Sequence, residues 1–538
     1  MTITHVNITG PKGNQGPPGL NGLPGLNGLD NGVPSGFLPQ AKIKLQEYFD
    51  NSINKFLPPA PNSHVANQDG VLFNWQLDYG TFGMSGIAHK GLDTVDVSSG
   101  TNPLTGNPVT ANTIQEFYSS TKLIVSLLLM MLWEQGALDM DEPIEKYIPE
   151  AQGVTYKVIR EVNKNEDGSY PSTYTEDGKE YPVEQHTEPD SGLVYAIALV
   201  DAKKSPAVRH VMSHSSGFAY NFWDLYMIPG QKGWGLQTHY NKLTNEKFEE
   251  MTDTTDRTTV AGMYAHYYQA GVLVCQPGEI FYYGMDSDIV GRLVEVGYNS
   301  LNPSSEEKRL QEIANEMLFE PLGMDSTFWY LLENDPKNSR IAENMAPRVV
   351  EDPTAEKGWV IRPGYESTET IMTGLTGVRA ESGGGGLLSC VNDYDKVVNM
   401  LRVGGRLNNI RFLKASTIRY MMKAPQSQTD NVVDSSIEFV KLALGGSQWS
   451  LGGALTPGWF DMHDPLNKSN APELEFGQNS TRELIPADAY SWGGAAGTGF
   501  LISPEDNFCY NFASFNAYFP SIYYMLQAPV DLLLTNSE

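Results

Sequence analysis

The sequence predicts an α/β fold, with one sheet assembled from distant parts of the chain and a helical subdomain inserted between them. Strand-like segments occur toward both ends: short apolar stretches broken by glycines around 71–90, and alternating aromatic and polar residues in Phe500–Ser503 and Phe508–Phe515. Helical patterns lie between them, at about 119–136, 286–299, 305–318 and 392–403. Strands at both ends around a helical middle favour this architecture, because each sheet face needs a covering layer.

The composition bounds the size of the fold and the class of its partners. With 538 residues, of which 40% are hydrophobic, the chain is long enough for one large domain or for two to three ordinary ones. Its 64 acidic residues outnumber the 37 basic ones, and the formal net charge is −27. Such a field repels phosphate backbones and anionic membrane surfaces, so we expect no nucleic-acid partner.

Cysteines and apolar runs constrain the compartment only weakly. Cys275, Cys390 and Cys509 lie far apart and form no CxxC pair, so we expect buried thiols, with a single disulfide as the alternative. The N-terminus lacks the basic and apolar regions of a signal peptide. The longest apolar run, Leu123–Trp133, is shorter than the roughly 20 residues that a membrane-spanning helix needs. We therefore expect a soluble protein without a membrane span, whose localisation the sequence leaves unknown.

The N-terminal segment, residues 1–36, has a collagen-like pattern. Glycine occupies every third position over residues 10–28, with prolines between, and only glycine fits the axis of a collagen triple helix. The run is short and breaks at Asn31-Gly32. Two interpretations stay open: a disordered polyproline-like tail, and a small element that would assemble the protein as a homo-trimer.

The remainder, residues 37–538, is expected to form the folded domain. A Pro/Gly-containing hinge at 33–37 leads into a helix-like stretch at about 40–56. The helical subdomain is expected at about 119–380. Within it, residues 160–190 are polar and rich in Gly, Asp and Glu, which is typical of an inserted surface loop or hairpin.

The candidate catalytic centre is the tetrad Ser119-Ser120-Thr121-Lys122. A Ser-x-x-Lys pattern alone is weak, and the chain has two more, at Ser52/Lys55 and Ser305/Lys308. Only Ser119 opens a long apolar helix.

The position of Lys122 relative to Ser119 suits nucleophilic catalysis. A serine hydroxyl needs a base to take its proton, and Lys122 lies one helical turn away on the same face. Burial would lower the pKa of this amine toward the neutral form that accepts a proton, and the helix N-terminus would favour a developing oxyanion. The alternative is that Ser119 only caps the helix.

Other centres are less favoured. No Gly-x-Ser-x-Gly elbow occurs, which argues against an α/β-hydrolase. His210 and His214 are spaced to share a helix face, but no HExxH pattern or third ligand accompanies them, so no metal site is expected. Gly383–Gly386 lacks the ending of a phosphate-binding loop and is either a tight backbone crossing near a site or a simple loop.

Several segments together resemble the superfamily of penicillin-binding proteins and class C β-lactamases. They keep the superfamily's order and cover the chain from about residue 40 onward: Phe117–Lys122, Leu138–Pro149, Val211–Gly217, Gln276–Tyr283, Phe319–Met324, Glu381–Ser389 and Trp492–Thr498. The usual Tyr-x-Asn motif is Tyr283-Gly284-Met285 here, and its continuation to Gly291 is similar to the family VIII carboxylesterases.

The resemblance implies a β-lactamase/transpeptidase-like fold, an antiparallel sheet flanked by helices with an inserted helical subdomain. It makes Ser119 the nucleophile and Tyr283 a proton shuttle beside Lys122. The Lys-Thr-Gly motif of β-lactamases is matched by Trp492-Gly493-Gly494, which would bind substrate at the sheet edge, and the N–H of Ala495 would complete the oxyanion hole. His214 belongs to a family turn and is expected to be structural. Neither a metal nor an organic cofactor is implied.

The expected function is that of a serine hydrolase, carboxylesterase-like, acting on a small-molecule ester or amide through an acyl-enzyme. Met285 and Trp492 replace the amide and the cation with which a β-lactamase binds its substrate, which favours esters. The alternatives are a β-lactamase or a D-aminopeptidase/transpeptidase-type hydrolase. A third alternative is a non-catalytic binding or structural protein that uses the scaffold for display.

Overall fold

The computed structural model describes a set of segments from Val71 to Ser514. These are residues 71–79, 82–90, 110–188, 191–222, 233–251, 256–303, 306–332, 335, 347–351, 359–363, 380–423, 448–455, 489–495, 497–504 and 508–514. The collagen-like segment, the helix-like stretch at 40–56, and Ser52, Lys55 and Ser305 lie outside them.

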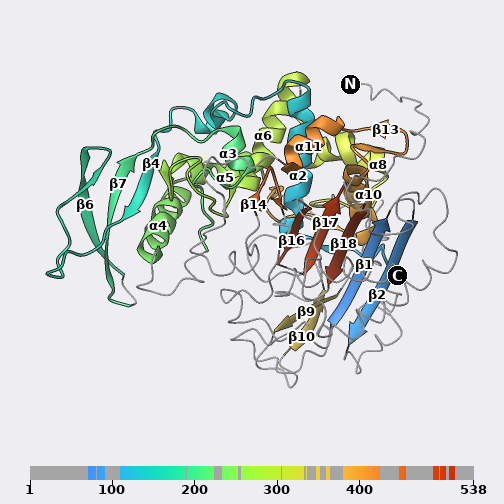
Figure 1. Ribbon diagram of the computed structural model, residues 1–538, viewed down its shortest axis with the longest axis horizontal. Helices are drawn as coiled ribbons and strands as arrows, with labels where there is room; N and C mark the ends of the chain where they lie inside the picture. Colours follow the sequence, from blue (N-terminus) through green and yellow to red (C-terminus); the bar gives the residue numbers. More distant parts are fainter. Residues whose placement is uncertain are drawn as a thin grey trace, which may run out of the picture.

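The central sheet joins strands from the two ends of the chain (Figure 1). It has seven strands, in the order β14 (Gln448–Trp449), β15 (Ala454–Leu455), β16 (Tyr490–Gly494), β17 (Thr498–Ser503), β18 (Phe508–Ser514), β1 (Val71–Tyr79) and β2 (Phe82–Lys90). Every neighbouring pair is antiparallel. The predicted fold class, including a sheet built from distant segments, is confirmed.

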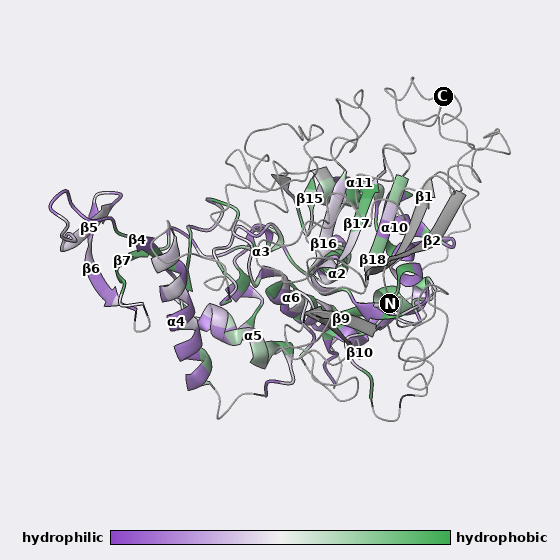
Figure 2. Ribbon diagram, turned by 90° about the horizontal axis from the view of Figure 1, so that it is seen from below, coloured by the Kyte–Doolittle hydropathy of each residue, from purple (hydrophilic) through white to green (hydrophobic). Residues whose placement is uncertain are grey.

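The middle of this sheet is buried, and a helix packs against it. All of β17 is buried, and Figure 2 shows hydrophobic residues along β17 and β18. Helix α10 (Val391–Arg402) packs against β17, β18 and β1. Asn511 on β18 donates a 2.9 Å hydrogen bond to Asp395 of α10, so the buried amide and carboxylate partly satisfy each other.

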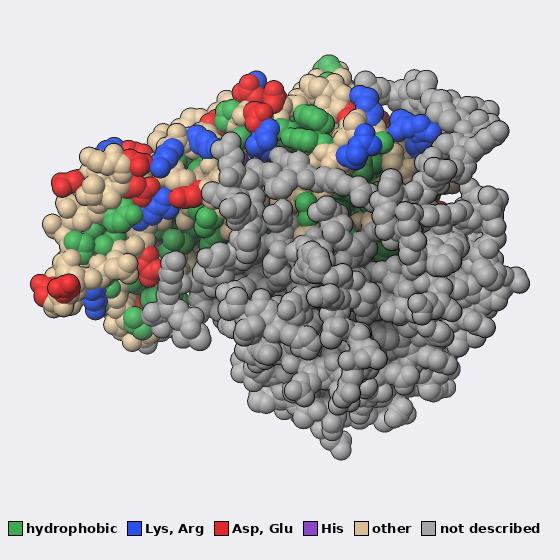
Figure 3. All heavy atoms as spheres, in the orientation of Figure 1, with side chains coloured by type: hydrophobic (Ala, Val, Ile, Leu, Met, Phe, Trp, Pro, Cys, Tyr) green, Lys and Arg blue, Asp and Glu red, His purple; other side chains and the backbone are tan. Residues whose placement is uncertain are grey.

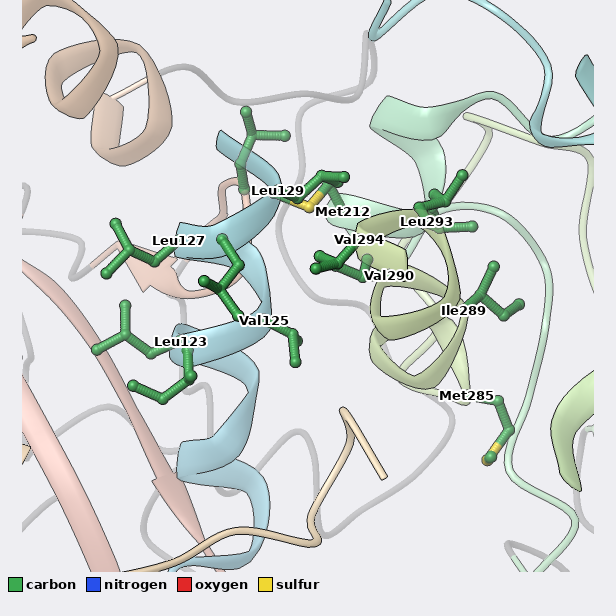
Figure 4. Packing of buried hydrophobic residues seen from close by; sticks show 14 of the residues in the cluster. Leu123, Val125, Leu127, Leu129, Met212, Met285, Ile289, Val290, Leu293 and Val294 are labelled. Atoms are coloured by element: carbon green, nitrogen blue, oxygen red, sulfur yellow. The ribbon is translucent and has the colours of Figure 1, made fainter. Parts of the chain in front are cut away.

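Helix α2 (Thr121–Glu134) is the apolar helix that the sequence predicted, and it is buried from Thr121 to Leu132. It packs against α6 (Asp286–Leu301). In Figure 4, Val125 and Leu129 lie on the side of α2 that faces Val290 and Val294 of α6, whereas Leu123 and Leu127 point to the opposite side. An apolar helix buried all round is a core element, and this packing fixes the start of α2 relative to the start of α6.

A second sheet lies within the region expected to be helical. Its order is β5 (Thr173–Glu176), β6 (Lys179–Thr187), β7 (Val194–Asp201), β4 (Lys157–Glu161) and β8 (Val272–Leu273). The β5–β6 hairpin turns at Asp177 and Gly178, whose φ angles of 52° and 76° suit a two-residue hairpin loop. A surface loop or hairpin was expected at 160–190, and the β5–β6 hairpin lies there. Its pairing with β7, β4 and β8 into one sheet was not predicted, because short apolar runs do not distinguish strand from helix.

The second sheet projects from one end of the molecule (Figure 1) and is hydrophilic along β6 (Figure 2). Figure 3 shows acidic and basic side chains interspersed over it.

The remaining elements are short helices, three two-stranded sheets and the helices around the two larger sheets. They are β3 (Gln115–Glu116), η2 (Tyr118–Ser120), η3 (Ile144–Lys146), η4 (Pro149–Ala151), α3 (Val208–Met212), α4 (Trp234–Glu250), α5 (Val260–Gln269), α7 (Leu310–Ala314), the π-helical turn η6 (Asn315–Phe319), α8 (Glu320–Leu322), β9 (Pro347–Glu351), β10 (Trp359–Pro363), β11 (Leu388–Ser389), β12 (Arg406–Leu407), β13 (Ile410–Arg411) and α11 (Ala415–Lys423). Within the described residues, no helix combines the length and the apolar character that a bilayer crossing requires. The three cysteines are buried and form no disulfide, as expected.

Candidate active site

Ser119 lies in a short 3-10 turn, η2, directly before α2. Glycine is required at Gly494 of β16, because a Cβ there would come within 2.4 Å of the carbonyl oxygen of Phe117. The same carbonyl accepts a 2.8 Å hydrogen bond from the hydroxyl of Thr498 on β17. The central sheet therefore holds the turn that carries Ser119. The first residue before α2 is Ser120, whose side chain makes no capping bond, so Ser119 does not cap this helix.

Lys122 is fully buried and its Nζ faces three oxygen atoms. Nζ lies 3.1 Å from Ser119 Oγ, 3.0 Å from Tyr220 Oη and 2.7 Å from the carbonyl oxygen of Gly384. Burial lowers the pKa of Lys122 to about 7, against a smaller opposing effect of the carboxyl groups of Asp288 and Asp286. A pKa near 7 lets this amine exchange a proton around neutral pH.

The glycine-rich segment Gly383–Gly386 supplies one of these oxygens. Its backbone lies against the start of α6, where a Cβ on Gly383 would come within 2.2 Å of the carbonyl oxygen of Ser287. Asp288 accepts hydrogen bonds from the Gly384 N–H at 3.1 Å and from the Ser382 hydroxyl at 2.7 Å. The tight backbone crossing near a site, one of the two expected alternatives, is confirmed.

Tyr283 lies beside Lys122, three residues before the first residue of α6. Its ring centroid is 4.8 Å from Lys122 Nζ. Its hydroxyl accepts a 3.1 Å hydrogen bond from the indole N–H of Trp492. Burial raises the pKa of Tyr283, against smaller lowering effects of hydrogen bonds with Ser119 and Trp492. Tyr283 is therefore a neutral phenol at neutral pH.

The predicted substrate-binding segment forms strand β16 and its end. Trp492 is 7% exposed and pairs with Phe500 of β17. Gly493 pairs with Gly499, and Gly494 approaches the nucleophile turn as described above. Ala495 follows the strand and is half-buried. The structure thus brings β16 to the same turn as Ser119. The roles of these four residues stay predictions.

His214 packs under Tyr283, with the ring centroids 4.7 Å apart. Its Nδ1 lies 3.1 Å from the buried carboxyl of Asp286. Burial lowers the pKa of His214 and raises that of Asp286, so the imidazole is neutral. His210 makes a separate contact, accepting a 2.9 Å hydrogen bond from the N–H of Ala207. Among the described residues, no three His, Cys, Asp or Glu side chains are grouped as a metal site requires.

The sequence analysis missed three groups around the lysine: the Tyr220 hydroxyl, the Gly384 carbonyl and the Asp288 carboxyl. Tyr220 stands three residues beyond Val211–Gly217, the segment that resembles the superfamily. Asp288 carried a usable signal, since acidic side chains near the start of a helix are favourable there. The Gly384 carbonyl had none, because a backbone oxygen has no sequence signature.

Solved structures with this fold include hydrolases and a synthase. EstCE1, described as a hydrolase with promiscuous acyltransferase activity, has a TM-score of 0.53 and 16% identity, covering 92% of this chain and 99% of that one. Unliganded simvastatin synthase (LovD) from Aspergillus terreus has a TM-score of 0.57 and 15% identity, covering 93% and 99%. The octameric penicillin-binding protein homologue from Pyrococcus abyssi has a TM-score of 0.51 and 16% identity, covering 91% and 77%. These likenesses define the class of fold, β-lactamase/transpeptidase-like.

The family follows from the sequence itself. The Beta-lactamase family model matches residues 76–514, which include the whole nucleophile turn, α6 and the central sheet from within β1 to β18. The chain belongs to this family. No curated protein matches it.

Proposed function

We propose that this protein is a serine hydrolase that cleaves an ester or amide through an acyl-enzyme on Ser119, with carboxylesterase-like specificity. The observation that carries the proposal is the buried amine of Lys122, whose pKa is lowered to about 7 and whose Nζ lies 3.1 Å from Ser119 Oγ. A general base works best when its pKa is near the operating pH. A lysine kept only for structure has no need of this combination.

Acylation forms the bond from Ser119 Oγ to the acyl carbon, breaks the bond to the leaving group and moves a proton in each half of the step. Neutral Lys122 takes the hydroxyl proton of Ser119 while Oγ attacks the carbonyl carbon of the substrate. The N–H groups of Ser119 and Ala495 hold the oxyanion. When the tetrahedral intermediate collapses, the ester C–O bond breaks and the leaving oxygen takes a proton from Tyr283. Lys122 then returns its proton to Tyr283 and restores the phenol, which leaves the acyl group on Ser119 Oγ.

Deacylation repeats these steps with an incoming hydroxyl. A water molecule or an alcohol gives its proton to Lys122 and attacks the acyl carbon. The bond to Ser119 Oγ then breaks, and Oγ takes a proton. EstCE1 is a hydrolase with promiscuous acyltransferase activity, which supports both outcomes for this chain.

Two side chains favour esters over β-lactams. Trp492 occupies the position of a carboxylate-binding cation, and its one N–H already bonds Tyr283. Met285 is 6% exposed and part of the hydrophobic core, so it offers no amide to a substrate. Loss of a charge-assisted contact costs about 1.5–3 kcal/mol, whereas an apolar acyl chain gains about 0.8 kcal/mol per buried methylene. Hydrolysis of β-lactams or D-amino-acid peptides is the second candidate.

The test combines labelling of Ser119 with a substrate panel. We expect a fluorophosphonate probe to modify the wild type, and Ser119→Ala to abolish both labelling and turnover while the melting temperature stays nearly unchanged. Ser52→Ala and Ser305→Ala, in the other two Ser-x-x-Lys tetrads, are the matched controls and should retain full activity. Loss of activity in either control with activity retained in Ser119→Ala would sink the proposal.

Short-chain p-nitrophenyl esters should be hydrolysed, and benzylpenicillin and nitrocefin weakly or not at all. A kcat/KM for either β-lactam above that for every neutral ester would replace the esterase assignment with the β-lactamase alternative. A wild type that neither reacts with the probe nor turns over any substrate would favour a binding or structural protein.

A further inference from the structure

Tyr220 contacts the amine of Lys122, and neither the sequence nor the mechanism above gives this tyrosine a role. It lies between α3 and α4, and its Oη is 3.0 Å from Lys122 Nζ. Gln237 of α4 donates a 2.9 Å hydrogen bond to the Tyr220 carbonyl, and the ring stacks on Phe222 with centroids 4.7 Å apart. Backbone and ring are thus both held, and the hydroxyl has a fixed position at the lysine.

The number of protons on Lys122 Nζ indicates a role for the Tyr220 hydroxyl. A neutral amine has two N–H donors and one lone pair, and here it faces three oxygens. The carbonyl of Gly384 can only accept, so it takes one N–H. If Ser119 gives its proton to the lone pair, the second N–H must point at Tyr220. Without an acceptor there, the amine can rotate its lone pair away from Ser119.

We infer that Tyr220 is a positioning residue, whose hydroxyl accepts the second N–H of Lys122 and so directs the lone pair of the amine at Ser119. This inference rests on the proposed function, because it assigns Lys122 as the base. The same three oxygens also suit the ammonium formed after proton transfer, which has three N–H donors. The heavy atoms need not move during the step.

A neutral acceptor is required at this place. A carboxylate at hydrogen-bond distance would hold the lysine in its charged form, whereas burial raises the pKa of Tyr220 well above its usual value and keeps it a phenol. The other titratable groups around the amine are the carboxyls of Asp286 and Asp288, the imidazole of His214 and the phenol of Tyr283. The Asp286 and Asp288 carboxyls are fully buried, and burial raises their pKa values too.

The experiment is the pH dependence of kcat/KM for Tyr220→Phe on p-nitrophenyl acetate. The variant keeps the ring and its stacking. We expect the plateau to fall about tenfold, because the lone pair is no longer directed. We also expect the acid limb to move to lower pH by about half a unit to one unit. A hydroxyl that accepts from nitrogen stabilises the ammonium more than the amine, so its removal lowers the pKa of Lys122.

Rates are expressed per fluorophosphonate-labelled serine, so that unfolded molecules do not count. Tyr282→Phe is the matched control: its buried hydroxyl donates a 2.7 Å hydrogen bond to Gln237 and does not bond Lys122. It should keep the wild-type acid limb. For Tyr220→Phe, a wild-type profile, or a reduced plateau with an unmoved limb, would overturn the inference and leave the serine hydrolase standing. A wild type without labelling or turnover would instead be a failure of the proposed function.

Discussion

Two buried cations, Lys122 of α2 and Arg292 of α6, lie near carboxyl groups of α6, and their hydrogen-bond partners differ. In the first turn of α6, Asp286 and Asp288 lie near Lys122, but the lysine hydrogen-bonds only to uncharged oxygens. In the second turn of this helix and beyond, Arg292 forms ion pairs with Glu150 at 2.8 Å and with Glu295 at 3.0 Å. Burial lowers the pKa of Lys122 to about 7, whereas the two glutamates keep the pKa of Arg292 above its usual value despite burial.

The comparison shows what separates a structural cation from a reactive one. Both cations are desolvated, and desolvation alone favours the neutral form. The arginine is compensated by carboxylates in direct contact and stays charged. The lysine donates hydrogen bonds to three uncharged oxygens, which satisfy its N–H groups without fixing its charge, so it can exchange a proton near neutral pH.

The largest effect is expected on stability, at the ion-paired arginine. Arg292→Met removes the charged partner of the buried carboxyl of Glu295 and of the partly exposed carboxylate of Glu150, which should lower the free energy of unfolding by about 3 kcal/mol. Activity per labelled Ser119 should stay near that of the wild type. Denaturant unfolding and active-site titration measure the two quantities. A stability within experimental error of the wild type would contradict the structural role of this network.

Replacement of Lys122 by methionine should have the opposite pattern: a large loss of activity and a small change in stability. Lys122→Met keeps the volume and removes the base, so kcat/KM should fall by about 100-fold or more. The free energy of unfolding should change by less than about 1.5 kcal/mol, because the lost hydrogen bonds are offset by removal of a desolvated amine. Ester hydrolysis and chemical unfolding at pH 8 test this pair of results. Near-normal rates would remove Lys122 from the mechanism.

A smaller effect, on kcat, is expected at Trp492 on strand β16 of the central sheet. Trp492→Phe removes the N–H that bonds Tyr283, and kcat should fall about tenfold while KM changes less. Trp449→Phe is the control, since its ring packs 4.6 Å from that of Trp492 but its indole nitrogen has no hydrogen-bond partner among the described residues. Equal losses in the two variants would mean that ring volume, and not the hydrogen bond to Tyr283, is what matters.

The sequence predicted the elements of this fold better than their surroundings. The apolar run after Ser119 predicted α2, and the strand patterns at 71–90 and 500–515 predicted a sheet built from distant parts, because periodicity is a local property. The sheet formed by β4 to β8 was missed, since runs such as Val194–Asp201 are too short to identify by periodicity.

Candidate residues with a chemical side chain, such as Lys122 and Tyr283, could be selected from motifs. The atoms that set their protonation could not. The Gly384 carbonyl and the Tyr220 hydroxyl lie 262 and 98 positions from Lys122 in the sequence and meet it only through tertiary packing. The degree of burial that lowers the lysine pKa is likewise a property of the assembled core.

The smallest effect is the pH dependence of the wild type near neutrality, and it tests the reactive side of the comparison directly. In the proposed mechanism Lys122 acts in its neutral form, so kcat/KM should rise with pH through a pKa of about 7. It should be about half-maximal at pH 7 and gain about twofold between pH 7 and pH 8. Burial raises the pKa of Tyr283 above the usual value of about 10, so the plateau should extend through pH 9 without a basic limb. Measurements on an ester whose spontaneous hydrolysis is subtracted, at constant ionic strength, give the profile. An acid limb below pH 5 would assign the base to a carboxylate. An acid limb above pH 9 would mean that Lys122 keeps the pKa of an exposed lysine. Either result would make Lys122 a structural cation like Arg292.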